Sequence, residues 1–320
     1  MFGARTPRST WMLPALALAV LAVVLSGCSL GPSSSTSPSK PSNGTILAQR
    51  KITTYGLPSA TLYQIFYECR GQRVEVYLTV PTDRGPFPLL VSLHGGAAWD
   101  TVLTHENFGY TASIAARLAS SHFARLYPEY QGYMESSGDV MGLYTDTLDT
   151  IAGIRAAQSI ARINRHRLYL PGASIGGGVA LKVASMLPGV KAVVAVSPYV
   201  GLRTVLPWQQ AHAQPGTFFD SQLGNEVSTY GAHPSFQILS KESPDITAIN
   251  APVLLLQGTG DHHVAWQTVQ PFSQEMKAAG KTVKLILYPG GHHGLHNANG
   301  AASLAAIHSW LQQYGLSFSP

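Results

Sequence analysis

A serine between glycines carries the clearest chemistry in this chain of 320 residues. The run GASIG, residues 172–176, directly follows an apolar segment that ends at Leu170 and directly precedes a segment with helical character. The nucleophile arrangement G-x-S-x-G requires this strand–turn–helix context, because a sharp turn then projects the serine hydroxyl above the sheet. The N-terminus of the following helix favours negative charge at the reacting centre. Ser174 is therefore predicted to be a nucleophile.

An acid and a histidine follow two later apolar segments. A serine hydroxyl is a weak nucleophile until a neighbouring base accepts its proton. Asp261 comes shortly after the apolar run 253–256, and His292 and His293 come shortly after 285–288. The carboxylate would hold an imidazole in the correct tautomer and stabilise its protonated form. The neighbouring His262 and His263 are expected to line the loop.

These motifs resemble the prolyl oligopeptidase/dienelactone hydrolase-like branch of the α/β-hydrolases. The resemblance covers roughly residues 74–311 and is carried by five motifs: HGG at 94–96, PEYQGY at 128–133, GASIGG at 172–177, QGTGDHHV at 257–264 and YPGGHHGL at 288–295. It implies a serine hydrolase whose catalytic residues follow in the order serine, acid, histidine. Relatives end in the pattern Y-P-x-x-x-H-G-[FL], which selects His293 over His292 as the base beside Ser174 and Asp261.

The same resemblance implies an oxyanion hole built from backbone N–H groups. The motif at 94–96 follows a buried segment, at the place where these enzymes position one donor. The N–H of Ala97 is the preferred donor there, with Gly96 as the less favoured choice. The N–H of Ile175, directly after the serine, is expected to supply the second donor. Such donors contribute a few kcal/mol of transition-state stabilisation.

Two departures from the family pattern bear on the substrate. Gln131 stands where relatives carry an arginine, so an ion pair of that arginine is expected to be absent, and Ala173 stands where peptidase relatives often carry an aromatic residue. The chain also lacks room for an N-terminal propeller. Together these features favour a small-molecule carboxylic ester as the substrate. Two alternatives stay open: a peptidase or amidase, and a surface lipoprotein that binds a partner without catalysis.

Neither a cofactor nor a metal is expected. His292 and His296 lie four residues apart and could bind a metal, but no glutamate separates them and no zinc-ligand spacing recurs. The glycine-rich run 172–178 is read as a nucleophile turn rather than a dinucleotide loop, because it lacks an early βαβ setting and a ribose-binding acid.

The elements that must position these residues alternate along the chain. Eight short, mostly apolar segments predict strands, of which the first two form an antiparallel hairpin: 62–68, 74–80, 89–93, 124–127, 167–170, 192–196, 253–256 and 283–287. Helices are expected at 110–119, 144–160, 177–186, 266–279 and 301–314. This alternation predicts an α/β-hydrolase fold with a mostly parallel eight-stranded sheet and helices on both faces. The long connection 201–250 is predicted to be a small helical cap.

The first 44 residues are predicted to direct export rather than to fold. Arg5 and Arg8 precede the uncharged, apolar run 12–25, which is shorter than the roughly 20 residues that a transmembrane helix needs. The tetrapeptide LSGC that ends at Cys28 resembles the lipobox of bacterial lipoproteins. We therefore expect a signal peptide at 1–27, a lipidated Cys28, a Ser/Pro-rich tether at 28–44 and a hydrolase domain at 45–320. The protein would be exported and lipid-anchored to a bacterial membrane.

Composition excludes several other classes of protein. With 45% hydrophobic and 12% charged residues, the chain is too apolar for a disordered protein. The formal net charge is +5, but two positive charges belong to the leader and the rest are scattered, so no nucleic-acid partner is expected. Of the two cysteines, Cys69 has no partner once Cys28 is lipidated, and it is expected to pack at the end of a strand. The sequence leaves the oligomeric state open.

Overall fold

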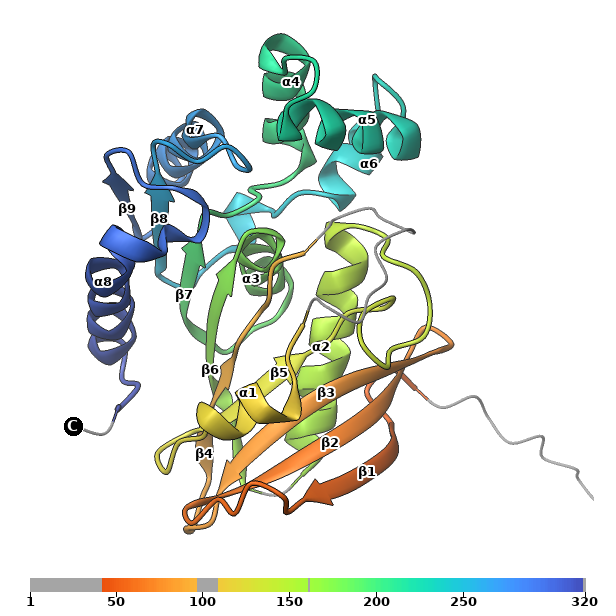
Figure 1. The fold of residues 1–320 in the computed structure, drawn as a ribbon, viewed down its shortest axis with the longest axis vertical. Helices are drawn as coiled ribbons and strands as arrows, with labels where there is room; N and C mark the ends of the chain where they lie inside the picture. The colour runs from red at the N-terminus through yellow and green to blue at the C-terminus, as the bar shows by residue number, and fades with distance from the viewer. Residues whose placement is uncertain (1–41, 97–108, 161, 319–320) are drawn as a thin grey trace, which may run out of the picture. The chain divides into compact units, whose positions relative to one another are not determined.

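A nine-stranded β-sheet runs through the structure, with helices on both of its faces (Figure 1). This computed structural model describes residues 42–96, 109–160 and 162–318. The strands are β1 (Ile46–Ile52), β2 (Ala60–Cys69), β3 (Gln72–Pro81), β4 (Phe87–Val91), β5 (Ala124–Pro128), β6 (Ile163–Ala173), β7 (Val190–Val196), β8 (Val253–Gly258) and β9 (Val283–Tyr288). Their order in the sheet is β1-β2-β3-β5-β4-β6-β7-β8-β9.

The sheet is mixed, with β1, β2, β3 and β5 joined by antiparallel pairings and the remaining pairings parallel. All eight expected strands are present, and the hairpin of β2 and β3 is confirmed. The prediction of eight strands is wrong by one, because it missed β1. This edge strand pairs with β2 and is exposed along most of its length. It therefore lacks the run of apolar residues by which a buried strand is recognised in a sequence. Cys69 is the buried last residue of β2, as expected.

Helices cover the two faces of the sheet unequally. The helices are α1 (Ala112–Arg117), α2 (Leu143–Ser159), α3 (Ile175–Met186), α4 (Leu202–His212), α5 (Phe218–Tyr230), α6 (Phe236–Lys241), α7 (Trp266–Ala278) and α8 (Gly300–Gln313). Side chains of α2, α3 and α7 join the largest apolar core on one face. Side chains of α8 pack in one smaller cluster with alternate residues of β7 and β8, and side chains of α1 pack in another with residues of β2, β3 and β5. The α/β-hydrolase arrangement is thereby confirmed.

The long connection after β7 is helical, as predicted. It consists of α4, α5, α6 and the short 3₁₀ helix η2 (Ile246–Ala248), and Figure 1 shows α4–α6 grouped beyond one end of the sheet. No helix in the described part of the chain is long and apolar enough to cross a membrane. The expected signal peptide, Cys28 and nearly all of the tether lie outside the described residues, so those expectations remain predictions.

Candidate active site

Ser174 lies in the turn between β6 and α3, where the sequence predicts a nucleophile. Its backbone dihedral angle φ is 56°, in the left-handed region that is strained for a residue other than glycine. The chain can turn this sharply because Gly172 has no side chain: a Cβ atom there would lie 2.2 Å from the carbonyl oxygen of Gly176. Glycine at 172 therefore allows the strand and the helix to approach each other, and Ser174 is left half-buried.

Gly176 is expected to tolerate no side chain. A Cβ atom at this position would lie 2.4 Å from the carbonyl oxygens of both Leu93 and His94, in the backbone that follows β4. We expect Gly176→Ala to lower the free energy of unfolding by about 1–3 kcal/mol, because the crowding forces the backbone to shift. Urea denaturation measures the change.

Gly224→Ala is the matched control for this substitution. Gly224 lies inside α5, and a Cβ atom there meets nothing within 4 Å. Alanine should keep or raise the stability there, by up to about 1 kcal/mol, because it is the better helix former. Equal stabilities of the two variants would contradict the close packing at Gly176.

Asp261 follows β8 and is buried in a loop that holds its carboxylate by several donors. Oδ1 accepts hydrogen bonds from the backbone N–H groups of His263 at 2.8 Å and Val264 at 3.0 Å. Oδ2 accepts one from Nε2 of the buried Gln257 at 3.1 Å. Burial raises the pKa of Asp261, but the hydrogen bond and charge of His293 and the two N–H groups outweigh it and hold the pKa below its ordinary range. The carboxylate is therefore ionised at neutral pH.

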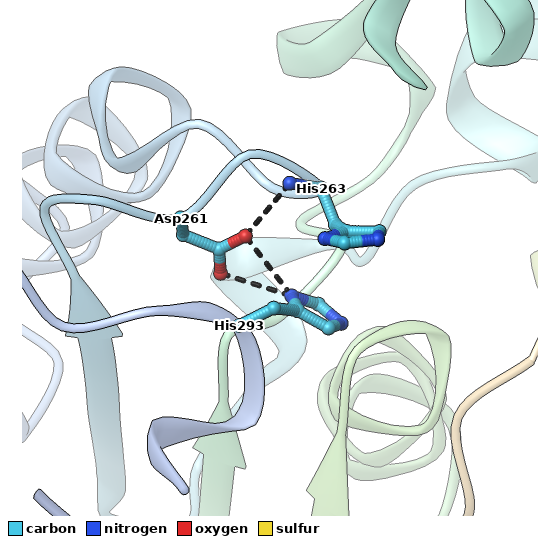
Figure 2. A group of neighbouring side chains, drawn as sticks. All are labelled: Asp261, His263 and His293. Carbon is cyan, nitrogen blue, oxygen red and sulfur yellow. Dashed lines mark hydrogen bonds and ion pairs between the residues drawn. The ribbon is translucent and has the colours of Figure 1, made fainter. Parts of the chain in front are cut away.

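His293 lies at the start of the short 3₁₀ helix η3 (His293–Leu295), directly beside Asp261 (Figure 2). Its Nδ1 atom lies 2.9 Å from Oδ2 and 3.1 Å from Oδ1 of the carboxylate. A carboxylate at Nδ1 favours the tautomer that carries its proton there, which leaves Nε2 free to accept a proton. His292, by contrast, is exposed, and its Nδ1 lies 3.2 Å from the carbonyl oxygen of Gly260. Of the two histidines, His293 therefore has the geometry of a general base.

Ser197 fastens the histidine loop to the strand beside the nucleophile. Ser174 donates its backbone N–H to the carbonyl of Val196 at 2.9 Å. The next residue, Ser197, accepts at Oγ a hydrogen bond of 3.1 Å from the N–H of Gly294. Because Gly294 directly follows His293, these two bonds bring the serine turn and the histidine loop to the same edge of the sheet. Ser174 Oγ makes no hydrogen bond with another described residue. In enzymes without substrate the hydrogen bond between a nucleophile and its base is often long, and it tightens only when substrate binds.

The expected oxyanion donors are placed in part. Ile175 begins α3 directly after the serine, so its N–H lies at the N-terminus of that helix. Gly95 packs on Ser174, since a Cβ atom on it would lie 3.1 Å from the serine Cβ, and Gly96 packs on the hydroxyl of Tyr133. The backbone after β4 thus runs past Ser174, where the sequence predicts an oxyanion donor. Ala97, the preferred donor, lies outside the described residues, and its role stays a prediction.

His94, in the loop after β4, is a buried histidine that packs against the loop after β5. Its ring is 8% exposed and stacks on Tyr130 at a centroid distance of 4.3 Å. Burial lowers the pKa of His94 to about 4, and burial raises the pKa of Glu129, whose Oε2 lies 3.4 Å from His94 Nε2, well above its ordinary value. His94 is therefore neutral near pH 7, and burial disfavours the charged form of Glu129. Glu129 also accepts the N–H of Tyr110 at 2.6 Å, which connects the loop to the chain before α1.

Two models of known families match most of this architecture. The model of the prolyl oligopeptidase family matches residues 143–316, which include the serine turn and both later loops. The chain belongs to the prolyl oligopeptidase family. The model of the acetyl xylan esterase family matches residues 48–213, so it covers the first strands and the serine turn. The expected membership of the α/β-hydrolases, as a serine hydrolase, is thereby confirmed.

Similar proteins include esterases and peptidases. A protein of Methylorubrum extorquens described as "Putative carboxymethylenebutenolidase" is 22% identical over 76% of this chain and 78% of its own length. The structure of an acetyl xylan esterase from a Paenibacillus species has a TM-score of 0.65 at 19% identity, covering 83% of this chain and 88% of that one. The acylaminoacyl peptidase of Pyrococcus horikoshii has a TM-score of 0.63 at 16% identity, covering 82% of this chain but 43% of that one.

In this member of the prolyl oligopeptidase family, Gln131 stands at the position where the family resemblance implies an arginine. Nε2 of Gln131 donates to Oδ1 of Asp149 at 2.8 Å, and its backbone N–H donates to Oδ2 at 2.9 Å. Both residues are buried, and Asp149 belongs to α2. The loop after β5 is therefore held to α2 by neutral amide donors in place of an arginine ion pair.

Trp208 and Phe219 of the cap pack against each other, whereas Phe218 packs against His263, with ring centroids 4.4 Å apart. Trp208 of α4 meets Phe219 of α5 edge to face, with ring centroids 5.0 Å apart. The crevice that these two rings border has a volume of about 10 Å³, which is enough for a water-sized group. Tyr230 lines a different hollow, and Phe218 is 49% exposed. Trp208 and Phe219 thus serve the core of the cap.

Glu226 of the cap is expected to make the stability of the fold depend on pH. Its side chain is fully buried, and Oε1 accepts a hydrogen bond of 3.0 Å from the hydroxyl of Tyr199. Burial raises the pKa of Glu226 from 4.5 to about 8, although the bond from Tyr199 lowers it. The folded protein therefore keeps a proton that the unfolded chain has lost, so stability falls as the pH rises from about 4.5 to about 8.

We expect Glu226→Gln to remove this part of the pH dependence, because the amide is neutral at every pH. The melting temperature of the natural protein should fall more between about pH 5 and pH 8 than that of the variant. At the higher pH the free energy of unfolding of the variant should exceed that of the natural protein by up to a few kcal/mol. Thermal unfolding at both pH values measures it. Glu275→Gln, at an exposed position of α7, is the control and should follow the natural protein.

Sequence reasoning missed two residues that position the site. Gln257 is fully buried, and its Nε2 also lies 3.0 Å from the carbonyl of Val264, so it braces the loop that carries Asp261. In the sequence, the only indication of this role is that Gln257 is a single polar residue directly after the apolar run 253–256 of β8. Ser197 has φ of 45° directly after β7, and only its contact with the distant Gly294 reveals a role.

Proposed function

We propose that this chain is a serine hydrolase that cleaves carboxylic esters through an acyl-enzyme, with Ser174, Asp261 and His293 as its triad. The observation that carries the proposal is the contact of 2.9 Å between His293 Nδ1 and Asp261 Oδ2, in a loop fastened beside the Ser174 turn. The named esterases among the similar proteins support an ester as the substrate class.

The reaction uses these groups in two half-reactions. Ser174 Oγ attacks the acyl carbon while His293 Nε2 accepts its proton, and Asp261 stabilises the imidazolium that forms. The oxyanion of the tetrahedral intermediate takes the N–H of Ile175 and a second N–H from the Gly96–Ala97 segment. Collapse of the intermediate breaks the ester bond, and the alcohol leaves with the proton from His293. Water then attacks the acyl-enzyme by the same route and releases the acid.

Hydrolysis of p-nitrophenyl acetate tests the proposal. A rapid release of nitrophenolate followed by slower steady turnover is expected, since formation and hydrolysis of an acyl-enzyme are separate steps. A fluorophosphonate should add once to the folded protein, and mass spectrometry of its peptides should find the adduct on Ser174. A protein that neither turns over the ester nor reacts at Ser174 would be a binding protein instead.

A peptidase is the second candidate, favoured by the match to the prolyl oligopeptidase family and the likeness to an acylaminoacyl peptidase. The same triad would then attack an amide carbonyl. Peptide p-nitroanilides distinguish the two activities: a kcat/KM for anilides that exceeds the value for acetyl esters would make the protein a peptidase. A series of esters from acetyl to palmitoyl then defines the acyl group.

We further propose that Cys28 is lipidated and anchors the enzyme to a bacterial membrane. The lipobox-like sequence before Cys28 and the tether behind it support this proposal. Expression in a bacterium with a labelled fatty acid should give a labelled protein in the membrane fraction. Cys28→Ser should abolish the label, whereas Cys69→Ser, at a buried cysteine, should keep it. Label on the Cys28→Ser variant would contradict the anchor.

A further inference from the structure

Two loops at the end of the sheet face each other with paired histidines. His262 and His263 follow Asp261 after β8, and His292 and His293 follow β9. The ring of His263 lies over that of His293, with centroids 4.7 Å apart and planes inclined by 33°. The rings of His262 and His292 lie 6.3 Å apart. The proposed reaction uses one of these four imidazoles, which leaves His263 without an assigned role beside the base.

Asp261, His263 and His293 together offer a set of metal ligands. One nitrogen or oxygen atom from each lies within 4.8 Å of the others, and Figure 2 shows the carboxylate and both rings gathered at one place. Zinc holds nitrogen and carboxylate ligands at about 2.0–2.2 Å, so two ligands of one ion lie at most roughly 4 Å apart. Binding therefore requires the exposed ring of His263, which packs against Phe218 with ring centroids 4.4 Å apart, to rotate toward Asp261 and His293.

The chemistry of this set points to a transition-metal ion. Two imidazoles and one carboxylate are ligands that zinc accepts, and three protein ligands leave a fourth position for water. This group of ligands differs from His292 and His296, the pair whose spacing in the sequence could suit a metal. His296 packs against Gly294, where a Cβ atom would lie 2.6 Å from its Nε2, and it does not belong to the group.

We propose that Asp261, His263 and His293 bind a divalent zinc-like ion that reversibly inhibits the enzyme. The inhibitory role rests on the proposed function, because it requires His293 to be the general base. Asp261 lies at Nδ1 of His293, so an ion that both residues hold binds the histidine at Nδ1. The ion then takes the place of the direct contact with Asp261, and the ring proton moves to Nε2, which can no longer accept the proton of Ser174. Binding therefore stops the reaction, and removal of the ion restores it.

His263→Asn separates the ion from catalysis. The hydrogen bond from residue 263 to Asp261 comes from the backbone N–H, so the asparagine variant keeps it. We expect its ester hydrolysis without metal to stay within about threefold of the natural rate, while the zinc concentration for half inhibition rises at least about tenfold. His262→Asn, at the neighbouring histidine outside the group, should keep the natural zinc sensitivity.

The experiment uses the full chain without a histidine tag, treated with a chelator and then titrated with zinc chloride. Hydrolysis of p-nitrophenyl acetate reports inhibition, which EDTA should reverse, and calorimetry reports binding directly. The visible absorption of Co²⁺ in place of zinc reports nitrogen and oxygen ligands. The natural protein should show one bound ion, and His263→Asn should lose it.

The two readouts separate failure of this inference from failure of the proposed function. Zinc binding that is lost in His263→Asn, in a protein that hydrolyses no ester, would keep the metal site and overturn its inhibitory role. Ester hydrolysis that is equally sensitive to zinc in the natural protein and in His263→Asn would overturn the metal site and keep the hydrolase. Hydrolysis that zinc leaves unchanged would overturn the inference as well.

Discussion

Replacement of Ser174 by alanine is expected to lower the kcat for p-nitrophenyl acetate by about 10⁴-fold or more. Alanine lacks the hydroxyl that forms the acyl-enzyme, and no other hydroxyl can take its place in the turn between β6 and α3. The change removes one oxygen atom from a half-buried position, so the fold should keep its stability. Stopped-flow and steady-state rates at matched protein concentrations measure the loss, and the initial burst should vanish with it.

Ser185→Ala is the matched control on the same helix. Ser185 lies near the end of α3, where its Oγ donates to the carbonyl of Lys182 at 2.7 Å, away from the turn. This variant should keep both the rate and the reaction with a fluorophosphonate. If Ser174→Ala hydrolysed the ester as fast as the Ser185 variant does, the nucleophile would be another residue and the proposed triad would be wrong.

The second large effect distinguishes the two adjacent histidines. His293→Asn should lower kcat by about 10³–10⁴-fold, because of the two histidines only His293 contacts Asp261, and it is the proposed base for Ser174. His292→Asn should change kcat by less than about threefold, because its ring is exposed and lies against the Gly260 carbonyl. The pair differs by one position in the chain and receives the same substitution, so each variant controls the other.

The pH dependence of the two histidine variants adds an independent measurement. In the natural protein and in His292→Asn, kcat/KM should fall at acid pH as the base becomes protonated. The residual rate of His293→Asn should lose this acid limb. A larger loss of kcat in His292→Asn than in His293→Asn would instead assign the base to His292, and Asp261 would then orient a residue that takes no part in proton transfer.

The residues alone determined the sheet, the serine turn and the order of the catalytic groups. A strand buried on both faces needs a continuous apolar run, and such runs mark the six strands from β4 to β9. Alternating β-branched and aromatic residues mark the hairpin of β2 and β3. Glycine at 172 is required by a local contact, because a Cβ atom there would lie 2.2 Å from the carbonyl oxygen of Gly176, four residues along the chain. Local requirements of this kind leave a signature in the sequence. The exposed edge strand β1 has no such requirement, and so it escaped prediction.

Only the tertiary structure decided how distant segments meet at the site. It joins Ser197 to Gly294 and Gln131 to Asp149, and it places His263 over His293. These contacts depend on which strands lie side by side and on the rotation of each loop, and neither quantity follows from the spacing of residues along the chain. The sequence could therefore name Ser174, Asp261 and His293, whereas the folded loops show which groups brace the carboxylate of Asp261.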